Sequence, residues 1–319
     1  MIDFNKSIFG SYLGKGQLHE AIDYLSNFED KKDILKSYLD LFEKSQDYIR
    51  TDNETLGKLD HIYQNYYRNV FWNNIMNADA QKILFQELWL FCGSRDELSV
   101  DETIEEEVLK IVKAEGYEYL GGQTQGYYGP YIWKSSTRET YEVELPTGIE
   151  LYTVVMMDGF ISRSWLDFLT FGESGAGGWA EDDGTLCCVR SAYQKGSEEV
   201  FNISFLKHEA QHAYDKKTYR NLLSVDLEYR AKLVELIYWP IDRKIKAILR
   251  EADNSNPDNS HAMAAYRIIS KMSLELFQSK SVPADSFWED KIEEVQKHAL
   301  VLLEESSKEL ETSRVNVSL

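Results

Sequence analysis

Residues 208–212, His-Glu-Ala-Gln-His, constrain the fold more than any other feature of the sequence, because they form the pattern H-E-x-x-H. Residues four apart on an α-helix lie one above the other on the same face. His208 and His212 can therefore offer two imidazoles to one metal ion. Glu209 is rotated by about 100° from His208, so it can reach a metal-bound water without ligating the metal. The pattern predicts a helix that carries a catalytic zinc site.

The residues around this pattern favour a helix that packs on a core. Apolar side chains recur at helical spacing, namely Ile203, Phe205, Leu206, Ala210 and Ala213. In a catalytic site of this kind the ion lowers the pKa of its water, and Glu209 takes the proton as the water attacks a carbonyl. The alternative interpretation is an amphipathic surface helix with two exposed histidines and no metal.

Two histidines need a further ligand, and the next helix offers one. Residues 224–236 have a helical pattern, with Ser224 or Asp226 as the expected N-cap. A short connection would make this helix an antiparallel neighbour of the motif helix. At a rise of 1.5 Å per residue, Glu228 then lies at about the same level as His212. We therefore expect Glu228 to be the third metal ligand.

The set His208-Glu209-x-x-His212 with a later Glu228 resembles the gluzincin branch of the zincin metallopeptidases. The resemblance covers about residues 185–236, and fifteen residues separate His212 from Glu228, fewer than in many gluzincins. It implies a Zn²⁺ ion held by His208, His212 and Glu228, with Glu209 as the base. It also implies a peptide or protein substrate and an α+β fold, in which a small twisted sheet precedes the motif helix.

Other residues compete for places in the site. Asp215 shares a helix face with His212, so it could ligate the metal or accept a hydrogen bond from a ligand's second nitrogen, and Glu235 could do the latter. Cys187 or Cys188 could supply sulfur, as one cysteine does in peptide deformylases. A metal-dependent amidase or deformylase therefore stays open as an alternative, as does a non-catalytic metal-binding scaffold or sensor.

His261 is a candidate second catalytic residue. It follows a loop over residues 254–260 and falls in the first turn of the next expected helix. A helix N-terminus disfavours a charged imidazole, and a neutral imidazole can donate a hydrogen bond to a developing oxyanion. The alternative is an exposed residue at a cap, and three tyrosines are rival donors: Tyr214, Tyr219 and Tyr229.

The rest of the chain predicts a mostly helical α+β protein in two regions. Helical periodicity fills a first region over residues 1–98. The second, 99–319, is the expected zincin-like domain. It contains a helix over 99–114, a sheet within 116–192, metal helices within 203–250 and C-terminal helices within 258–311, the last of them over 286–311.

Glycines, prolines and β-branched residues define the sheet region. Strands are expected at 131–134, 140–145, 151–157 and 185–190. In zincins a strand in the last position often borders the cleft, so we expect 185–190 to pair with extended peptide and changes at Val189 and Arg190 to alter substrate binding. The glycine-rich stretch 172–178 lacks a following Gly-Lys-Ser/Thr, which favours a turn or rim over a phosphate-binding loop.

Composition narrows the partners and the compartment. The 319 residues carry a formal charge of −19, which argues against nucleic acid because phosphates would be repelled. No apolar stretch approaches eighteen residues, so no membrane span is expected. Three cysteines and a first stretch without a long apolar run predict a cytoplasmic protein without a disulfide framework or a signal peptide.

Overall fold

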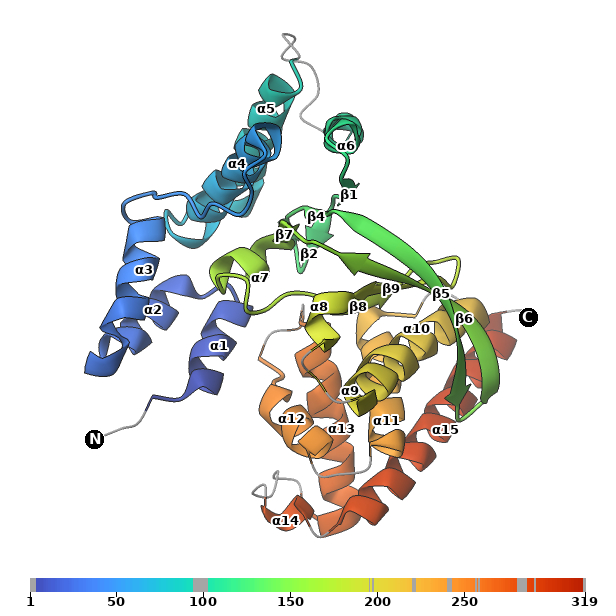
Figure 1. The fold of residues 1–319 in the computed structure, drawn as a ribbon. Helices are drawn as coiled ribbons and strands as arrows, with labels where there is room; N and C mark the ends of the chain where they lie inside the picture. Colours follow the sequence, from blue (N-terminus) through green and yellow to red (C-terminus); the bar gives the residue numbers. More distant parts are fainter. Residues whose placement is uncertain are drawn as a thin grey trace. The chain divides into compact units, whose positions relative to one another are not determined.

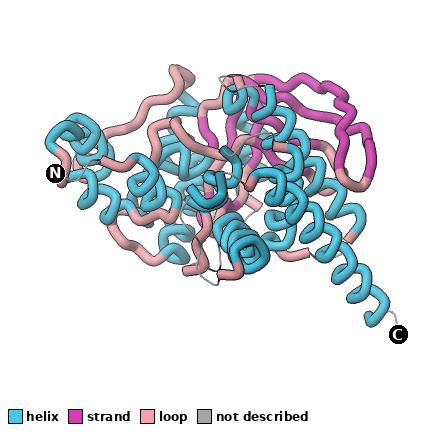
Figure 2. Tube along the Cα trace, turned by 90° about the horizontal axis from the view of Figure 1, so that it is seen from below, coloured by secondary structure: helices cyan, strands magenta, loops and turns pink. Residues whose placement is uncertain are grey.

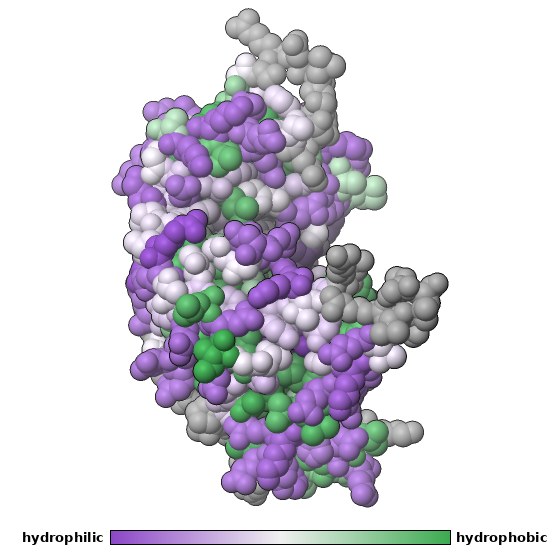
Figure 3. Space-filling view, turned by 90° about the vertical axis from the view of Figure 1, so that its right-hand side faces the viewer, coloured by the Kyte–Doolittle hydropathy of each residue, from purple (hydrophilic) through white to green (hydrophobic). Residues whose placement is uncertain are grey.

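A computed structural model describes residues 4–93, 103–194, 196, 198–219, 222–239, 243–255, 257, 259–279, 286–289 and 291–317. Helices predominate over strands, so the predicted mostly helical α+β class is confirmed (Figure 1, Figure 2). Hydrophilic side chains predominate on the face drawn in Figure 3, as the charged composition leads one to expect. Among the described helices, none combines the length and the apolar character needed to cross a membrane.

Contacts between residues divide the chain into two compact units. The first unit comprises residues 1–135 and 158–176, and the second comprises 136–157 and 177–319. The predicted boundary between residues 98 and 99 lies outside the described residues. Residues 103–135 group with the N-terminal helices, because their strands pack on the aromatic core that those helices build.

The first unit contains the helices expected in residues 1–95. They are α1 (Lys6–Gly14), α2 (Leu18–Ser26), a 3₁₀ turn (Glu29–Lys31), α3 (Lys32–Phe42), α4 (Glu54–Phe71) and α5 (Asn77–Phe91), followed by α6 (Ile104–Ala114) and α7 (Ser164–Leu169). The beginning of the helix predicted at 99–114 lies outside the described residues. A three-stranded sheet has the order β1 (Glu118–Leu120), β4 (Tyr131–Trp133), β7 (Ser162–Arg163), and β2 (Gln123–Thr124) pairs with β3 (Tyr127–Tyr128).

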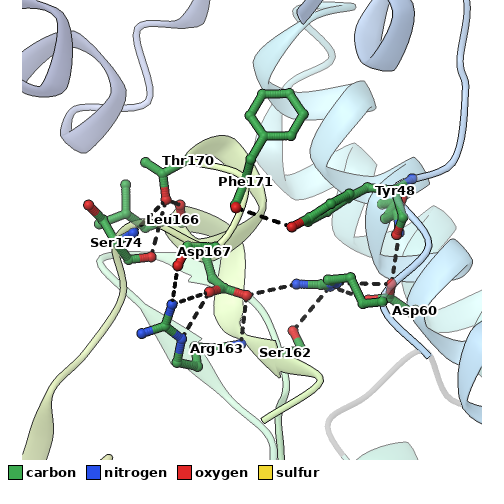
Figure 4. A network of polar contacts seen from close by, with 12 residues as sticks. Tyr48, Asp60, Ser162, Arg163, Leu166, Asp167, Thr170, Phe171 and Ser174 are labelled. Atoms are coloured by element: carbon green, nitrogen blue, oxygen red, sulfur yellow. Dashed lines mark hydrogen bonds and ion pairs between the residues drawn. The ribbon is translucent and has the colours of Figure 1, made fainter. Parts of the chain in front are cut away.

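A buried ionic network fastens the first unit internally (Figure 4). Arg50, only 6% exposed, donates from Nη1 to Asp167 Oδ2 at 2.8 Å and from Nε to Asp60 Oδ2 at 3.1 Å. Arg163 Nε donates to the other oxygen of Asp167 at 2.9 Å. These charge-assisted bonds join the segment before α4 to α4 itself and to α7, which lie far apart in the sequence.

The second unit is built on a four-stranded sheet with the order β5 (Ser135–Leu145), β6 (Gly148–Asp158), β9 (Leu186–Val189), β8 (Gly178–Ala180). β6 and β9 are parallel, and β9 and β8 are antiparallel. The strands predicted at 140–145, 151–157 and 185–190 are therefore confirmed. The strand predicted at 131–134 is β4 in the first unit, so residues 116–192 form three separate sheets and not one.

The helices of the second unit follow β9. They are α8 (Arg190–Tyr193), α9 (Glu198–Phe201), a π-helix (Asn202–Lys207), α10 (His208–Thr218), α11 (Ser224–Tyr238), α12 (Arg243–Glu251), α13 (Ser260–Phe277), α14 (Ser286–Glu289) and α15 (Ile292–Val317). α11 packs against α10, α13 and α15. It ends at Tyr238, and Pro240, the predicted breaker, lies outside the described residues. The single helix predicted at 286–311 is wrong, because α14 and α15 are separate.

Candidate metal centre

The motif helix is held by the apolar stripe that the sequence predicts. Phe205 and Ala210 are fully buried, and Ile203, Leu206 and Ala213 are at most 7% exposed. α10 lies against β8 and β9 and against α11. The turn before it, Asn202–Lys207, is π-helical, which the sequence pattern did not predict. Burial of this stripe turns the opposite side of α10 toward α11.

The three predicted metal ligands come together between α10 and α11. The His208 and His212 rings lie 4.7 Å apart with their planes at 89°. Glu228 Oε2 lies 3.6 Å from His208 Nε2, and Glu228 Oε1 lies 3.4 Å from His212 Nε2. Within the described part of the chain, this is the one group of three or more His, Cys, Asp or Glu side chains spaced to hold an ion, with ligand atoms within 4.8 Å of one another.

Each imidazole lies at a spacing from one oxygen of Glu228 that a small ion could bridge. With zinc–nitrogen and zinc–oxygen bonds of about 2.0–2.2 Å, neighbouring tetrahedral ligands lie about 3.3–3.5 Å apart. The separations of 3.4 and 3.6 Å between Glu228 and the two imidazoles are close to that value. Two nitrogens and one carboxylate, all at most 12% exposed, form a donor set that suits zinc with one position open.

Glu235 fixes the orientation of the first histidine. Its Oε1 lies 2.8 Å from His208 Nδ1, so the opposite nitrogen, Nε2, faces Glu228. Ser204 Oγ in the π-helix donates to Glu235 Oε2 at 2.7 Å, and Lys244 Nζ pairs with the same oxygen. Burial acts to raise the pKa of Glu235, but the charges of Lys244 and His208 outweigh it and hold that pKa well below its usual range. Glu235 thus makes the predicted contact with the second nitrogen of a candidate ligand, His208.

Glu228 is held as a carboxylate between histidines. Burial opposes its charge, but the neighbouring His212 and His261 imidazoles outweigh burial and keep the pKa of Glu228 far below its usual range. Burial also opposes protonation of His212, yet Glu228 and the nearby acids raise the pKa of that imidazole. Each group thus stabilises the charged form of the other.

His261 lies beside Glu228 and outside the group of three candidate ligands. Its Nδ1 is 2.9 Å from Glu228 Oε2, and its side chain is 48% exposed. The capping loop predicted before it is present, since the Asn259 side chain accepts a hydrogen bond from Ala262 N at 3.1 Å. His261 lines the same cavity as the ligands, so its role as an oxyanion donor stays a prediction. The rival tyrosines do not line that cavity, and Tyr229 is fully buried.

Glu209 occupies a cavity of about 330 Å³ together with the three ligands. Its side chain is largely buried, and it makes no hydrogen bond or ion pair with another described residue. An acid in this position keeps its lone pairs available for a proton. The arrangement therefore brings a carboxylate without a hydrogen-bond partner and a candidate metal centre into one cavity.

The competing ligands are occupied elsewhere. Asp215 is fully buried and accepts hydrogen bonds from Arg230 Nε and Gln211 Nε2, each at 2.9 Å. Cys187 Sγ donates to Glu181 Oε1 at 3.7 Å, and burial and this nearby acid raise the pKa of the thiol to about 12. Cys188 lies in the hydrophobic core. The expected N-caps of α11 are also wrong: the N-cap is Leu223 without a side-chain bond, and Asp226 pairs with Arg267.

The strand that borders the cavity is β8, and not the predicted strand at residues 185–190. β9 has β6 on one side and β8 on the other, so residues 185–190 have no free edge for a peptide. Val189 is fully buried, and Arg190 donates to Thr137 and Glu139. β8 is the edge strand, and its residues Gly178–Ala180 line the cavity. The role predicted for 185–190 is therefore wrong.

The first residue of β8 is a glycine that packing requires. A Cβ on Gly178 would lie 2.4 Å from the Phe205 ring, so only glycine lets β8 approach the π-helix. The run of glycines resembles a turn in the sequence, but here it permits close packing.

Comparison of the chain with known protein families, with characterised proteins and with solved structures finds no match. The geometry of this centre is therefore the evidence from which a function is argued.

Proposed function

We propose that this protein is a zinc-dependent metallopeptidase of the zincin type, similar to gluzincins. The observation that carries the proposal is the convergence of His208, His212 and Glu228 beside the free carboxylate of Glu209. A structural zinc site usually has four protein ligands, whereas three ligands and an open position are typical of catalytic zinc. Glu209 lines the same cavity, so it could act as a base on a water molecule bound at that open position.

The proposed division of labour follows from the contacts. His208, His212 and Glu228 would hold the ion, which when bound would polarise the scissile carbonyl and lower the pKa of a water molecule. Glu209 takes the proton of the attacking water and passes it to the leaving amine as the peptide bond breaks. Glu235 keeps His208 Nε2 directed at the site. His261, half exposed beside Glu228, is the proposed donor to the oxyanion.

An extended peptide has one backbone edge available next to this site. Gly177 O accepts from Val189 N, and Glu181 N donates to Thr185 O, just before β9. In an antiparallel ladder the backbone groups of Gly178 and Ala180 therefore point the other way. Ala180 O already accepts a hydrogen bond from Lys216 Nζ at 2.8 Å. Substrate pairing is therefore proposed at Gly178, where a main-chain contact orients the peptide across the cavity.

Replacement of Glu209 by Gln tests the proposal. The variant keeps the shape of the side chain but cannot accept a proton, so it should retain zinc at one ion per chain and lose hydrolysis of a peptide library. A drop of at least about a hundredfold in turnover is expected for loss of a general base. Full hydrolysis by the zinc-loaded variant would remove Glu209 from the mechanism.

The same experiment separates the alternatives. Zinc at one ion per chain without turnover on any peptide would favour a non-catalytic scaffold or sensor. An amidase or deformylase that uses Cys187 as a ligand has lost support, because that thiol is paired with Glu181 at 3.7 Å and lies outside the ligand group. A cytoplasmic location and the lack of a nucleic-acid partner remain predictions from the cysteine count and the acidic charge.

A further inference from the structure

Among the described residues that line the cavity of the candidate metal centre, Lys216 is the one with a basic aliphatic side chain, and no arginine joins it. It lies four residues after His212, so His208, His212 and Lys216 follow one another along the same face of α10. Its side chain is 33% exposed, against 73% for its neighbour Lys217, which pairs with Glu150 and does not line the cavity. The position of Lys216 therefore differs from that of an ordinary surface lysine.

The Lys216 ammonium is only partly satisfied. It donates to Ala180 O at 2.8 Å and to Asp182 Oδ1 at 3.1 Å. An ammonium has three N–H donors, and the third has no partner among the described residues. Asp182 is 99% exposed, and an ion pair with so exposed a partner is weak and easily exchanged. A charged donor is therefore available to an anion that enters the cavity.

The other charges of the cavity select where such an anion can lie. Glu209 and Glu228 are the acids of the cavity lining and Lys216 is its lysine, so Lys216 is the side chain of the lining that can form an ion pair with a substrate carboxylate. Lys216 lies about 6 Å further along α10 than His212, at 1.5 Å per residue. An extended chain covers that distance in about two residues. A carboxylate on Lys216 thus sets a peptide bond one or two residues away against the metal centre.

We infer that Lys216 binds the C-terminal carboxylate of the substrate, so that the enzyme removes one or two residues from the free carboxyl end of peptides. The inference rests on the proposed peptidase function and adds its substrate class. The proposed main-chain contact at Gly178 agrees with this inference. Lys216 Nζ donates to Ala180 O, the next outward-facing carbonyl of β8, so the backbone of a bound peptide would end near Lys216. In each cycle one water is consumed, one peptide bond breaks and the proton passes to the released amine.

The test compares two mixtures of N-acetylated pentapeptides of random sequence, one with a free carboxyl terminus and one with a terminal amide. Cleavage is measured by mass spectrometry for the wild type, Lys216→Met, Lys216→Arg and the matched control Lys217→Met. Binding of both mixtures is measured separately on zinc-loaded protein that also carries Glu209→Gln. Circular dichroism and zinc content establish that each variant is folded and loaded.

We expect the wild type to prefer the free acid by about tenfold or more, as a charge-assisted hydrogen bond provides. The preference should disappear in Lys216→Met, mainly through KM, and should persist in Lys216→Arg and Lys217→Met. Equal use of acid and amide, or a preference that survives Lys216→Met, would overturn the inference while leaving the peptidase in place. Amides ending in Asp or Glu that bind as well as free acids would also overturn it.

The binding measurement decides the matter when no peptide is cleaved. A preference for free acids that depends on Lys216 would then support the carboxylate site, although the proposed peptidase function would have failed. Equal binding of acids and amides would reject the carboxylate site whatever the outcome for hydrolysis. The binding measurement thus tests the carboxylate site at Lys216, and the hydrolysis measurement tests the proposed peptidase function.

Discussion

Replacement of Glu235 by Gln should weaken zinc binding without unfolding the protein. Glu235 accepts from Ser204 Oγ at 2.7 Å, contacts His208 Nδ1 at 2.8 Å and pairs with Lys244. A glutamine has nearly the same shape, but it lacks the charge that holds Lys244 and the His208 N–H. Loss of such an orienting partner lowers metal affinity by about 10–100-fold. That corresponds to about 1.4–2.8 kcal/mol of binding free energy at 1.4 kcal/mol per factor of ten.

The assay is a titration of metal-free protein with zinc in competition with a coloured chelator, with circular dichroism to report folding. Glu251→Gln is the matched control, because Glu251 pairs with Lys232 on α11 at 2.7 Å and contacts no histidine. Its zinc affinity should stay within about twofold of the wild type, because zinc affinity depends on the ligands and their hydrogen-bond partners. Unchanged affinity in folded Glu235→Gln, or an equal loss in Glu251→Gln, would refute the idea that this carboxylate orients His208.

Three further substitutions test the packing around the centre. Gly178→Ala should cost about 1–3 kcal/mol of unfolding free energy in urea denaturation, because the new Cβ would lie 2.4 Å from Phe205; no loss would mean that β8 is less tightly packed. Gly10→Ala lies inside α1, and the new Cβ would meet no atom within 4 Å outside its own helix. It should therefore raise the unfolding free energy by about 0.5–1 kcal/mol, and a lower unfolding free energy would contradict the helix at this position. Asp215→Asn should cost about 3–5 kcal/mol, because it leaves Arg230 charged and fully buried, and a cost below about 1 kcal/mol would show that the pair is not needed.

The convergence of His208, His212 and Glu228 could be predicted from the sequence because its information is local. H-E-x-x-H fixes two imidazoles on one helical face, and the short connection to α11 fixes the level of Glu228. The apolar stripe around Phe205 settles which side of α10 faces the core. Glu235 was also foreseeable as a partner of a ligand, since it lies two turns past Glu228 on the same helix.

The rest depends on contacts that no local pattern encodes. The π-helix at Asn202–Lys207 leaves no distinct periodicity, so Ser204 could not be linked to Glu235 from the sequence. β8 is three residues long and begins at a glycine that packing demands, so it resembled a turn. Strand order is likewise non-local, because nothing in the residues of β9 reveals that β8 pairs with it.

The approach of His261 to Glu228 also comes from the tertiary fold. α13 begins more than thirty residues after Glu228 in the sequence, and its capping loop alone predicts only an exposed histidine. The fold of α13 against α11 brings Nδ1 to 2.9 Å from the carboxylate. The same holds for Lys216, whose contact with β8 depends on how that strand lies against α10.

Anomalous diffraction at the zinc edge, from crystals of protein loaded with one equivalent of zinc, tests the central claim most directly. We predict one peak, bonded at about 2.0–2.2 Å to His208 Nε2, His212 Nε2 and a Glu228 oxygen, with a further position facing Glu209. A peak at other residues, or no bound zinc with these side chains intact, would contradict the proposed metal centre and the hydrolase built on it.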